Sequence, residues 1–506
     1  MMEMIKYKKY LRILLSRADI FLFAFIFSAS LLMLNNSVLS IDDTFETFFS
    51  GEISPLKNFH YGTWVIKLQT LLLYQLPQKL NINIQDWSLM FSGLIKSTVI
   101  TFLMYCSSKF MKLYKISRIT VFFTVFLLFY MYISYQIELG LSDFIINEGF
   151  FRFVIPSLLT YTALYYLYKF LAAGVKISKF GFLCIFLCAS SSEISAVICL
   201  TVCFCSILYF IINKYSREKI KCLMLIFSIM AAGAFMLLSS KGFGEHFSSK
   251  FNSGAFNVLD CINNLPEFLS FFYDKLICDF GIFYVLIILF LCLQYKKISD
   301  IKFVFPLFIL FSCLLFCFSL IILGKTSYRN NFWIDHPDIY TIIAPVIVLA
   351  VLISFCNTIE ASNKYIKKQI CLVLIITAFV FSFSLAGKIR LIRWTMKCVK
   401  QYVYLLDKMT LFYSYKNEIP IFPIPSPQFS VFQNAEEMYY EHTAKNYYYQ
   451  TVYKLPEKIN ISERIVMPYK KAAEKFELDG GSASEIKNRN IKFAKLENRN
   501  FVLSNN

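Results

Sequence analysis

The sequence predicts an all-α polytopic membrane protein with about eleven transmembrane helices and a small extracytoplasmic C-terminal region of mixed α/β structure. Hydrophobic residues make up 57% of the 506 residues, and only 17% are charged. A soluble domain of this size carries about a quarter charged residues. Several apolar runs reach the ~20 residues that a helix needs to cross ~30 Å of hydrocarbon.

The first span covers about residues 20–40, and its basic N-terminal flank places the N-terminus in the cytoplasm. Residues 61–76 are apolar but short and contain Lys67, which predicts a helix along the outer membrane surface that ends at Pro77. The other spans follow from apolar length, with orientation set by Lys and Arg in short loops. They are expected at about 87–107, 119–137, 151–171, 222–240, 277–295, 303–323, 339–356 and 370–387.

Residues 180–213 contain two short apolar runs separated by Ser190-Ser191-Ser192-Glu193, with basic residues on both flanks. Two flanks on the same side of the membrane require a re-entry. We therefore expect two short helices that meet at a polar turn near the outer surface. A single long tilted span is the alternative, but it would place the basic loops at 214–221, 296–302 and 364–368 outside.

The composition becomes polar, basic and Tyr-rich near residue 388, which divides the chain into a transmembrane domain, 1–387, and a C-terminal region, 388–506. With about eleven spans, this region lies outside the cytoplasm. Residues 389–411 have apolar residues at helical spacing with Lys and Arg on the other face, which is typical of an amphipathic helix at a membrane surface. A small mixed domain is expected over 426–506.

Charge and motifs exclude several classes of protein. The net charge of +18 does not indicate nucleic acid binding, because many Lys and Arg residues lie in short tracts between apolar runs. Most of the 15 cysteines fall inside apolar runs, and no CxxC motif has a matching pair, so no metal site is expected. Without a Walker A motif, a Gly-rich dinucleotide loop or HExxH, we expect no cofactor, and energy must come with an activated substrate or a gradient.

An acidic pair, Asp42-Asp43, opens the first loop that is predicted to lie outside the cytoplasm. Asp residues also cap helices and favour turns, which is the simplest alternative. Glu46 and Glu52 follow closely, however, so this loop is an acidic patch beside anionic headgroups. One carboxylate of the pair is placed to act as a general base while the other orients an acceptor.

Two further segments are candidates for substrate binding. Glu193 lies between two apolar runs, where a carboxylate is costly unless it reaches water or a partner; it is either a solvated turn residue or a ligand for sugar hydroxyls. The loop from 325 to 338 combines cations, aromatic residues and carboxylates. In this loop Lys325 and Arg329 are suited to a phosphate, Trp333 to a sugar face or to the membrane interface, and His336 lies close by.

Other cations on the outer side are Lys67 and Arg152, although Arg152 begins a span and also has the position of a snorkelling residue. Lys96 lies inside the second span with no neighbouring charge. An ionisable residue at such a position is a functional-site hypothesis by default, and the alternative is that Lys96 only faces the membrane interface.

The sequence resembles the GT-C superfamily of polytopic glycosyltransferases, which use polyprenyl-phosphate-linked sugars. The resemblance is carried by Asp42-Asp43, the expected interfacial helix after them, the SSSEIS turn at 190–195 and the C-terminal tail. In length and layout the chain is similar to the phage-encoded, serotype-converting O-antigen glucosyltransferases of enteric bacteria. Some members of this family have an Arg soon after the acidic pair, but residues 41–60 of this chain contain none. The resemblance therefore assigns no phosphate ligand there.

The resemblance implies a protein of the bacterial inner membrane that acts on its periplasmic face without a metal. A polyprenyl-phosphate-linked sugar, in this subgroup glucose, is the donor, and lipid-linked O-antigen is the acceptor. Asp42 or Asp43 would deprotonate an acceptor hydroxyl, which attacks the anomeric carbon with inversion, and Lys325 or Arg329 would stabilise the leaving lipid phosphate.

Two alternatives stay open. An O-antigen polymerase is also polytopic, but usually has a large outer loop with several arginines. A flippase or transporter of lipid-linked glycans would place charges within its spans and contain broken helices; Lys96 and residues 180–213 are the features that favour it.

Overall fold

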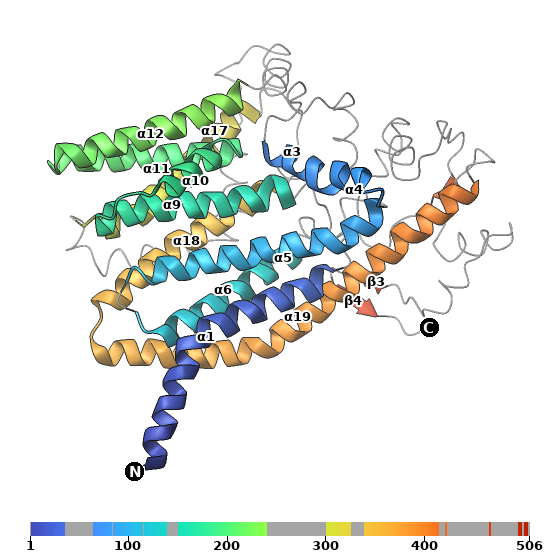
Figure 1. Cartoon of the computed structure of the whole chain (residues 1–506), viewed down its shortest axis with the longest axis horizontal. Helices are drawn as coiled ribbons and strands as arrows, with labels where there is room; N and C mark the ends of the chain where they lie inside the picture. The colour runs from blue at the N-terminus through green and yellow to red at the C-terminus, as the bar shows by residue number, and fades with distance from the viewer. Residues whose placement is uncertain are drawn as a thin grey trace.

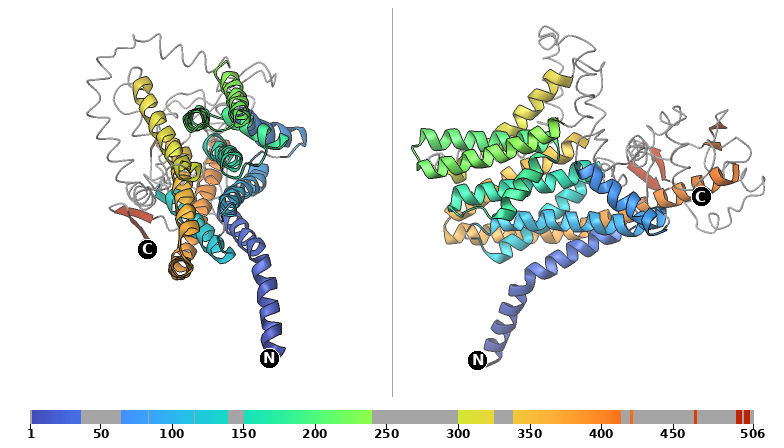
Figure 2. Two further views of the ribbon diagram at one scale, coloured as in Figure 1. Left: turned by 90° about the vertical axis from the view of Figure 1, so that its left-hand side faces the viewer. Right: turned by 45° about the horizontal axis from the view of Figure 1, so that its top comes forward.

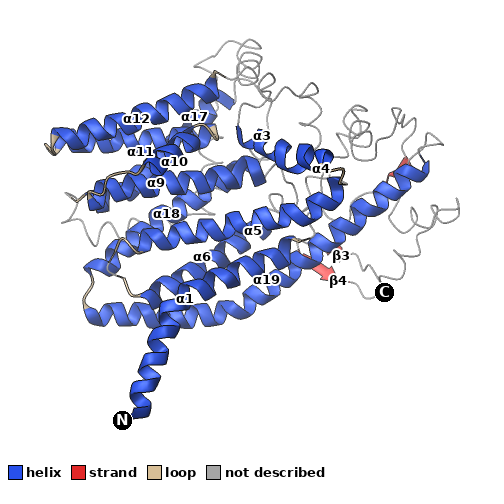
Figure 3. Cartoon of the chain, viewed as in Figure 1, coloured by secondary structure: helices blue, strands red, loops and turns tan. Residues whose placement is uncertain are grey.

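The structure is a computed structural model that describes residues 2–35, 64–82, 84–114, 116–138, 150–239, 300–324 and 338–413, together with four short strands. The described chain is mostly helical (Figures 1 and 3). The helices are α1 (Met2–Leu34), α3 (Trp64–Thr70), α4 (Leu76–Lys79), α5 (Ile84–Met111), α6 (Arg118–Glu138), α9 (Ile155–Ala173), α10 (Lys179–Ala189), α11 (Glu193–Ile212), α12 (Arg217–Leu238), α17 (Ile301–Gly324), α18 (Asp338–Ala361) and α19 (Lys364–Tyr413), with π-helical turns η1 (Leu71–Gln75) and η2 (Phe150–Val154).

The strands are short. β1 (Pro420–Ile421) pairs in parallel with β2 (Ile465–Val466), and β3 (Ala494–Glu497) pairs antiparallel with β4 (Asn500–Leu503). The rest of the predicted mixed domain over 426–506 lies outside the described residues, so that domain stays a prediction.

Among the described residues, six helices are long and apolar enough to cross a membrane. This supports a multi-pass membrane protein. The predicted span 277–295 lies outside the described residues, so the total of about eleven spans stays a prediction. The six segments are Met90–Met111, Arg118–Ile137, Glu193–Ile212, Arg217–Leu238, Ile342–Ala361 and Lys364–Trp394.

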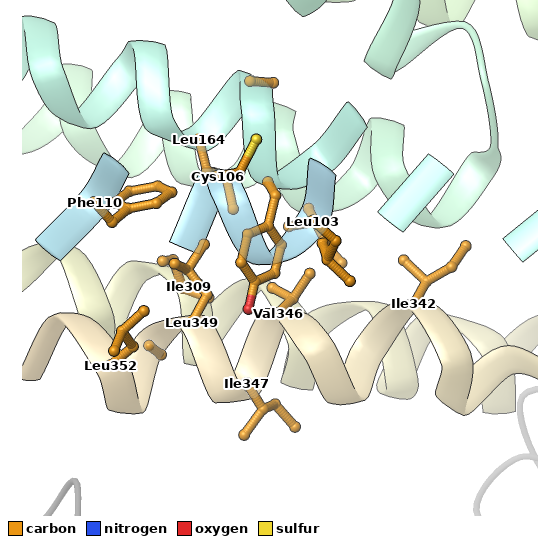
Figure 4. Packing of buried hydrophobic residues seen from close by; sticks show 14 of the residues in the cluster. Leu103, Cys106, Phe110, Leu164, Ile309, Ile342, Val346, Ile347, Leu349 and Leu352 are labelled. Carbon is orange, nitrogen blue, oxygen red and sulfur yellow. The ribbon is translucent and has the colours of Figure 1, made fainter. Parts of the chain in front are cut away.

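The helices form two groups that meet along a central seam. In one group α1, α5, α6 and α19 pack together, and in the other α9, α10, α11, α12, α17 and α18 do. The groups join where α5 packs against α9 and α18 (Figure 2). Figure 4 shows this seam, with Leu103 and Phe110 of α5, Leu164 of α9 and Val346 of α18 gathered between the helices. Residues that are far apart in the chain therefore form one core.

Short connections gather at one end of the bundle. The links α5–α6, α9–α10, α11–α12 and α18–α19 all lie at the same end (Figures 1 and 3). We call it the basic end, because these connections carry Lys112, Lys176 and Lys214, and α19 begins there with Lys364. We call the opposite end, where α1 ends and α5, η2 and α18 begin, the junction end.

Buried tyrosine contacts close the core at the basic end. The hydroxyls of Tyr114 and Tyr168 are hydrogen-bonded, and the Nζ of Lys302 lies 5.6 Å from the centre of the Tyr114 ring. Burial raises the pKa of Tyr114 well above its usual value, so this phenol stays neutral at physiological pH. Nearby, Lys302 pairs with Glu360 at 3.1 Å and joins α17 to α18.

Several hydroxyl groups inside the spans are satisfied locally. Ser97 donates to the Gly93 carbonyl at 2.6 Å, Thr101 to the Ser97 carbonyl at 2.7 Å and Ser206 to the Val202 carbonyl at 2.7 Å, all four residues back along their helices. Such bonds let hydroxyl groups lie in a medium that offers no water.

Pro306 in α17 requires a different solution. Proline has no N–H, so the carbonyl of Lys302 loses its partner within the helix. The buried side chain of Asn357 in α18 donates to this carbonyl at 2.6 Å. A helix defect in α17 thereby becomes a specific contact between two helices.

Three expectations for individual elements can be compared with the structure. Residues 180–213 form two helices joined by the turn Ser190–Ser192, as predicted, but only α10 is short; α11 is long enough to span. Pro77 does not end the helix before it, because the π turn η1 precedes Pro77 and α4 continues to Lys79. The helix predicted over 389–411 is the uninterrupted continuation of α19, since no proline follows residue 388 within it.

Candidate functional site at the junction end

The first feature of the junction end is a close crossing of α1 and α5. A Cβ on Gly93 would lie 2.6 Å from the carbonyl oxygen of Leu34, so only glycine allows the end of α1 to rest on α5 here. The segment with Asp42, Asp43 and Glu46 leaves α1 from this crossing. These three residues lie outside the described residues, and their roles stay predictions.

Lys96 lies one helical turn after Gly93 on α5 and is fully buried. Its Nζ is 5.6 Å from the centre of the Phe150 ring in η2. The flanking Ser92 and Ser97 are also buried, so this part of α5 presents a polar stretch inside an apolar bundle. Burying an ammonium group costs several kcal/mol in real proteins, and intramembrane cations typically mark a binding or transport site.

The π turn η2 places Arg152 beside the same region. Arg152 lies two residues after Phe150, whose ring Lys96 contacts, and α3, which contains Lys67, packs against η2. π turns are frequent at functional sites because they shift the helix register locally. The side chains of Lys67 and Arg152 lie outside the described parts, so the structure places only their backbone.

A second π turn fixes α3 and α4 to α5. The indole Nε1 of Trp87 at the start of α5 donates to the Leu72 carbonyl in η1 at 2.9 Å. A π turn leaves carbonyl groups that the regular helix would have used, and Trp87 satisfies one of them. The elements that carry Lys67 and Lys96 are therefore held together by a hydrogen bond that the sequence alone did not predict.

The segment 325–337, predicted to be an outer loop, also leads to this end. It precedes Asp338, the first residue of α18, and α18 packs against η2 and α5. Lys325, Arg329, Trp333 and His336 themselves lie outside the described residues.

Glu193 lies in the first turn of α11 and is exposed. Ser192 caps this helix by accepting a hydrogen bond from the Ser195 amide at 3.1 Å. A carboxylate at this position is also favoured by the helix dipole, so the cap explains Glu193 without a ligand. The structure does not link Glu193 to Lys96 by any contact among the described residues.

Behind this cap is a hydroxyl network that the sequence analysis missed. Thr160 of α9 donates to Ser195 at 2.9 Å, and Ser192 donates to Ser195 at 2.8 Å. The Sγ atoms of Cys188 and Cys199 lie 3.4 Å apart beside it. Small polar residues at helical spacing on α9 and α11 are the only feature of the sequence that points to this network. Such residues are common where membrane helices pack tightly, so they do not predict a specific network.

No known protein family matches this sequence, and no curated protein matches it.

The site is therefore assessed on its chemistry. One cation, Lys96, is buried at the junction end, and two more, Lys67 and Arg152, lie on elements that pack against each other there. A group of three His, Cys, Asp or Glu residues that could hold a metal does not occur in the described part of the chain. The structure places the side chain of Lys96 at this end, whereas those of Lys67 and Arg152 lie outside the described parts.

Proposed function

We propose that the protein is a GT-C-type inverting glycosyltransferase of the bacterial inner membrane. It moves a sugar, glucose in the subgroup it resembles, from a polyprenyl-phosphate donor to O-antigen on the periplasmic face. The N-terminus is then cytoplasmic, and residues 388–506 are periplasmic.

One observation carries this proposal: the elements that hold or adjoin the expected site residues meet at the junction end. The end of α1 leads to Asp42 and Asp43, α3 and η2 contain Lys67 and Arg152, and the 325–337 loop leads into α18. These elements contact one another through η2 and α5. The proposal requires that the carboxylates and cations that these elements carry or lead to lie on one face of the bundle, as an acid–base transfer from a lipid phosphate needs.

The proposed reaction is a direct displacement at the anomeric carbon. A carboxylate of Asp42 or Asp43 takes the proton of an acceptor hydroxyl, and the oxygen attacks the anomeric carbon of the donor sugar. The bond between that carbon and the phosphate oxygen breaks, and its electron pair leaves with polyprenyl phosphate. Cations at the junction end stabilise the charge that develops on this phosphate.

The test is sugar transfer by membranes that contain the full chain, supplied with lipid-linked glucose and an O-antigen acceptor. Asp42→Asn or Asp43→Asn should abolish transfer, because an amide keeps the shape but cannot accept the proton. Lys96→Met should lower transfer at least roughly tenfold if its charge stabilises the phosphate, whereas Lys96→Arg should retain part of it. Asp19→Asn is the matched control, since it removes a carboxylate at the basic end, where Asp19 pairs with Lys112.

Normal transfer by both Asp variants would refute the assignment of the acidic pair. Normal transfer by Lys96→Met would remove Lys96 from the site.

A transporter of lipid-linked glycans is the second candidate, and two observations favour it. Lys96 is buried within a candidate span, and the α10–α11 hairpin interrupts a membrane segment with a capped polar turn. The two functions differ in chemistry: a transporter moves the intact lipid-linked sugar across vesicles and releases no polyprenyl phosphate. Vesicles that translocate the donor without cleaving it would support the transporter.

A further inference from the structure

The helix α19 has two opposite faces. Its buried face consists of Ala378, Leu385, Ile392 and Met396, in a helix that packs against α6 and α1. The opposite face is open: Leu372, Ile376, Phe379 and Phe383 are each between 55% and 69% exposed. These residues are spaced by four, three and four positions, so they form one stripe along the helix.

The same stripe continues into a charged segment towards the junction end. Gly387 follows Phe383 by four positions, and a Cβ there would meet nothing within 4 Å. Arg390 comes three positions later, and Arg393, which is also exposed, follows it by three. Residues at i and i+3 are neighbours on a helix surface, so both guanidinium groups can reach one ligand.

The two arginines have no internal explanation in the described part of the chain. Neither one forms an ion pair or hydrogen bond with a described residue. No Asp or Glu occurs between residues 388 and 406. Adjacent like charges at this spacing weaken a helix slightly, and a bound anion would remove that cost.

Membrane topology does not explain them either. The opposite end of α19 has Lys364, Lys367 and Lys368, which already give the basic signal expected on the cytoplasmic side. Arginines at the junction end, the outer end in the proposed orientation, run against that rule.

We propose that this stripe is a binding site for a single-chain lipid phosphate, the polyprenyl phosphate that the proposed reaction releases. The identity of the lipid rests on the proposed function. Arg390 and Arg393 hold the phosphate, each as a bidentate donor, and the hydrocarbon chain lies along Phe383, Phe379, Ile376 and Leu372.

Dimensions and charge agree with this occupant. From Leu372 to Phe383 the helix rises about 16 Å, close to the depth of one leaflet of a ~30 Å hydrocarbon layer. Val373 and Val380, which are 60% and 58% exposed, lie beside the stripe, so the apolar face is wider than one side chain and the charge of the headgroup is what distinguishes between lipids. A phosphate monoester carries about −1.5 to −2 charges at pH 7, which matches two guanidinium groups, whereas a phosphodiester carries one.

The test is native mass spectrometry of the purified full chain with undecaprenyl phosphate, with and without a tenfold excess of phosphatidylglycerol. Arg390→Gln/Arg393→Gln should weaken undecaprenyl phosphate binding roughly a hundredfold, since each of the two lost charge-assisted contacts accounts for about a factor of ten. Lys364→Gln/Lys368→Gln, which removes two exposed charges from the other end of the same helix, should bind normally. The excess phosphatidylglycerol should displace little.

Three results would overturn the site. The first is equal binding by the arginine variant and the wild type, and the second is an equal loss of undecaprenyl phosphate binding in the lysine control. The third is displacement by phosphatidylglycerol, which would indicate a general anionic-lipid surface. An arginine-dependent dimer without bound lipid would instead assign the stripe to a second copy of the chain. The lipid site and the proposed function can fail independently. Arginine-dependent binding without any sugar transfer would retain the lipid site and refute the transferase. Sugar transfer without arginine-dependent binding would retain the transferase and refute the lipid site.

Discussion

At the scale of single residues, the structure separates side chains that packing explains from those it does not. Asn357 has a structural role, because its amide replaces the hydrogen bond that Pro306 denies to Lys302. Lys96 is instead a fully buried cation within a candidate span, and its burial carries a cost. That contrast supports Lys96, and not Asn357, as a residue of the functional site.

The link between Asn357 and Pro306 makes a prediction for stability. Asn357→Leu should lower stability by about 1 kcal/mol or more, because the Lys302 carbonyl loses its donor. In a Pro306→Ala background the same change should cost less, since the alanine N–H restores the bond within the helix. Thermal unfolding in detergent of the four variants in this cycle gives the coupling. Equal costs of Asn357→Leu in both backgrounds would show that the two positions are independent.

The sequence identified some functional or structural residues and did not identify others. The sequence identified Lys96 because a charge inside an apolar run is visible without a structure. It did not reveal Asn357 or the bond between Thr160 and Ser195, because their partners lie on helices distant in the chain. Polar residues in apolar runs can be recognised, but their partners depend on packing.

At the scale of elements, helix ends followed from the sequence where charge and apolar length agreed. α6 covers Arg118–Glu138 where 119–137 was predicted, and α17 covers Ile301–Gly324 where 303–323 was predicted. The prediction that the helix ends at Pro77 was wrong, and at residue 388 the composition changes while α19 continues. A compositional boundary marks a change of surroundings, and a helix can pass through it without a break.

Two glycines give a matched prediction about helix packing. Gly93→Ala should lower the melting temperature, since the added methyl group would overlap the Leu34 carbonyl and push α1 away from α5. Gly387→Ala should raise stability by about 0.5–1 kcal/mol, because alanine favours the helix and the position is open. Both variants replace a helical glycine with alanine, so helix propensity alone predicts that both changes raise stability. Stabilisation by Gly93→Ala would show that α1 does not rest on α5 as described.

At the scale of the whole molecule, the division into two helix groups could not be predicted from the sequence. Apolar length and charge indicate how often the chain crosses the membrane, but not which helices are neighbours. The contact of η2 with α3 and α18 joins residues that are far apart in the chain. Sequence alone could therefore nominate Lys67, Arg152 and the 325–337 loop as candidates, and the fold shows that the elements leading to them share one end.

The last prediction concerns orientation. The α10–α11 hairpin returns the chain to the basic end, so the connections at 174–178 and 213–216 lie on the same side (Figure 1). With α19 running from the basic end to the junction end, the cytoplasmic N-terminus that we propose puts the residues after 388 in the periplasm.

Alkaline phosphatase, which is active only in the periplasm, should be active when fused at Lys400 and inactive when fused at Lys297. A fusion at Lys214 should match the one at Lys297, because the hairpin keeps both on the cytoplasmic side. Equal activity at Lys400 and Lys297 would contradict this orientation, and it would move the acidic pair, with the sugar transfer proposed for it, away from the periplasmic face.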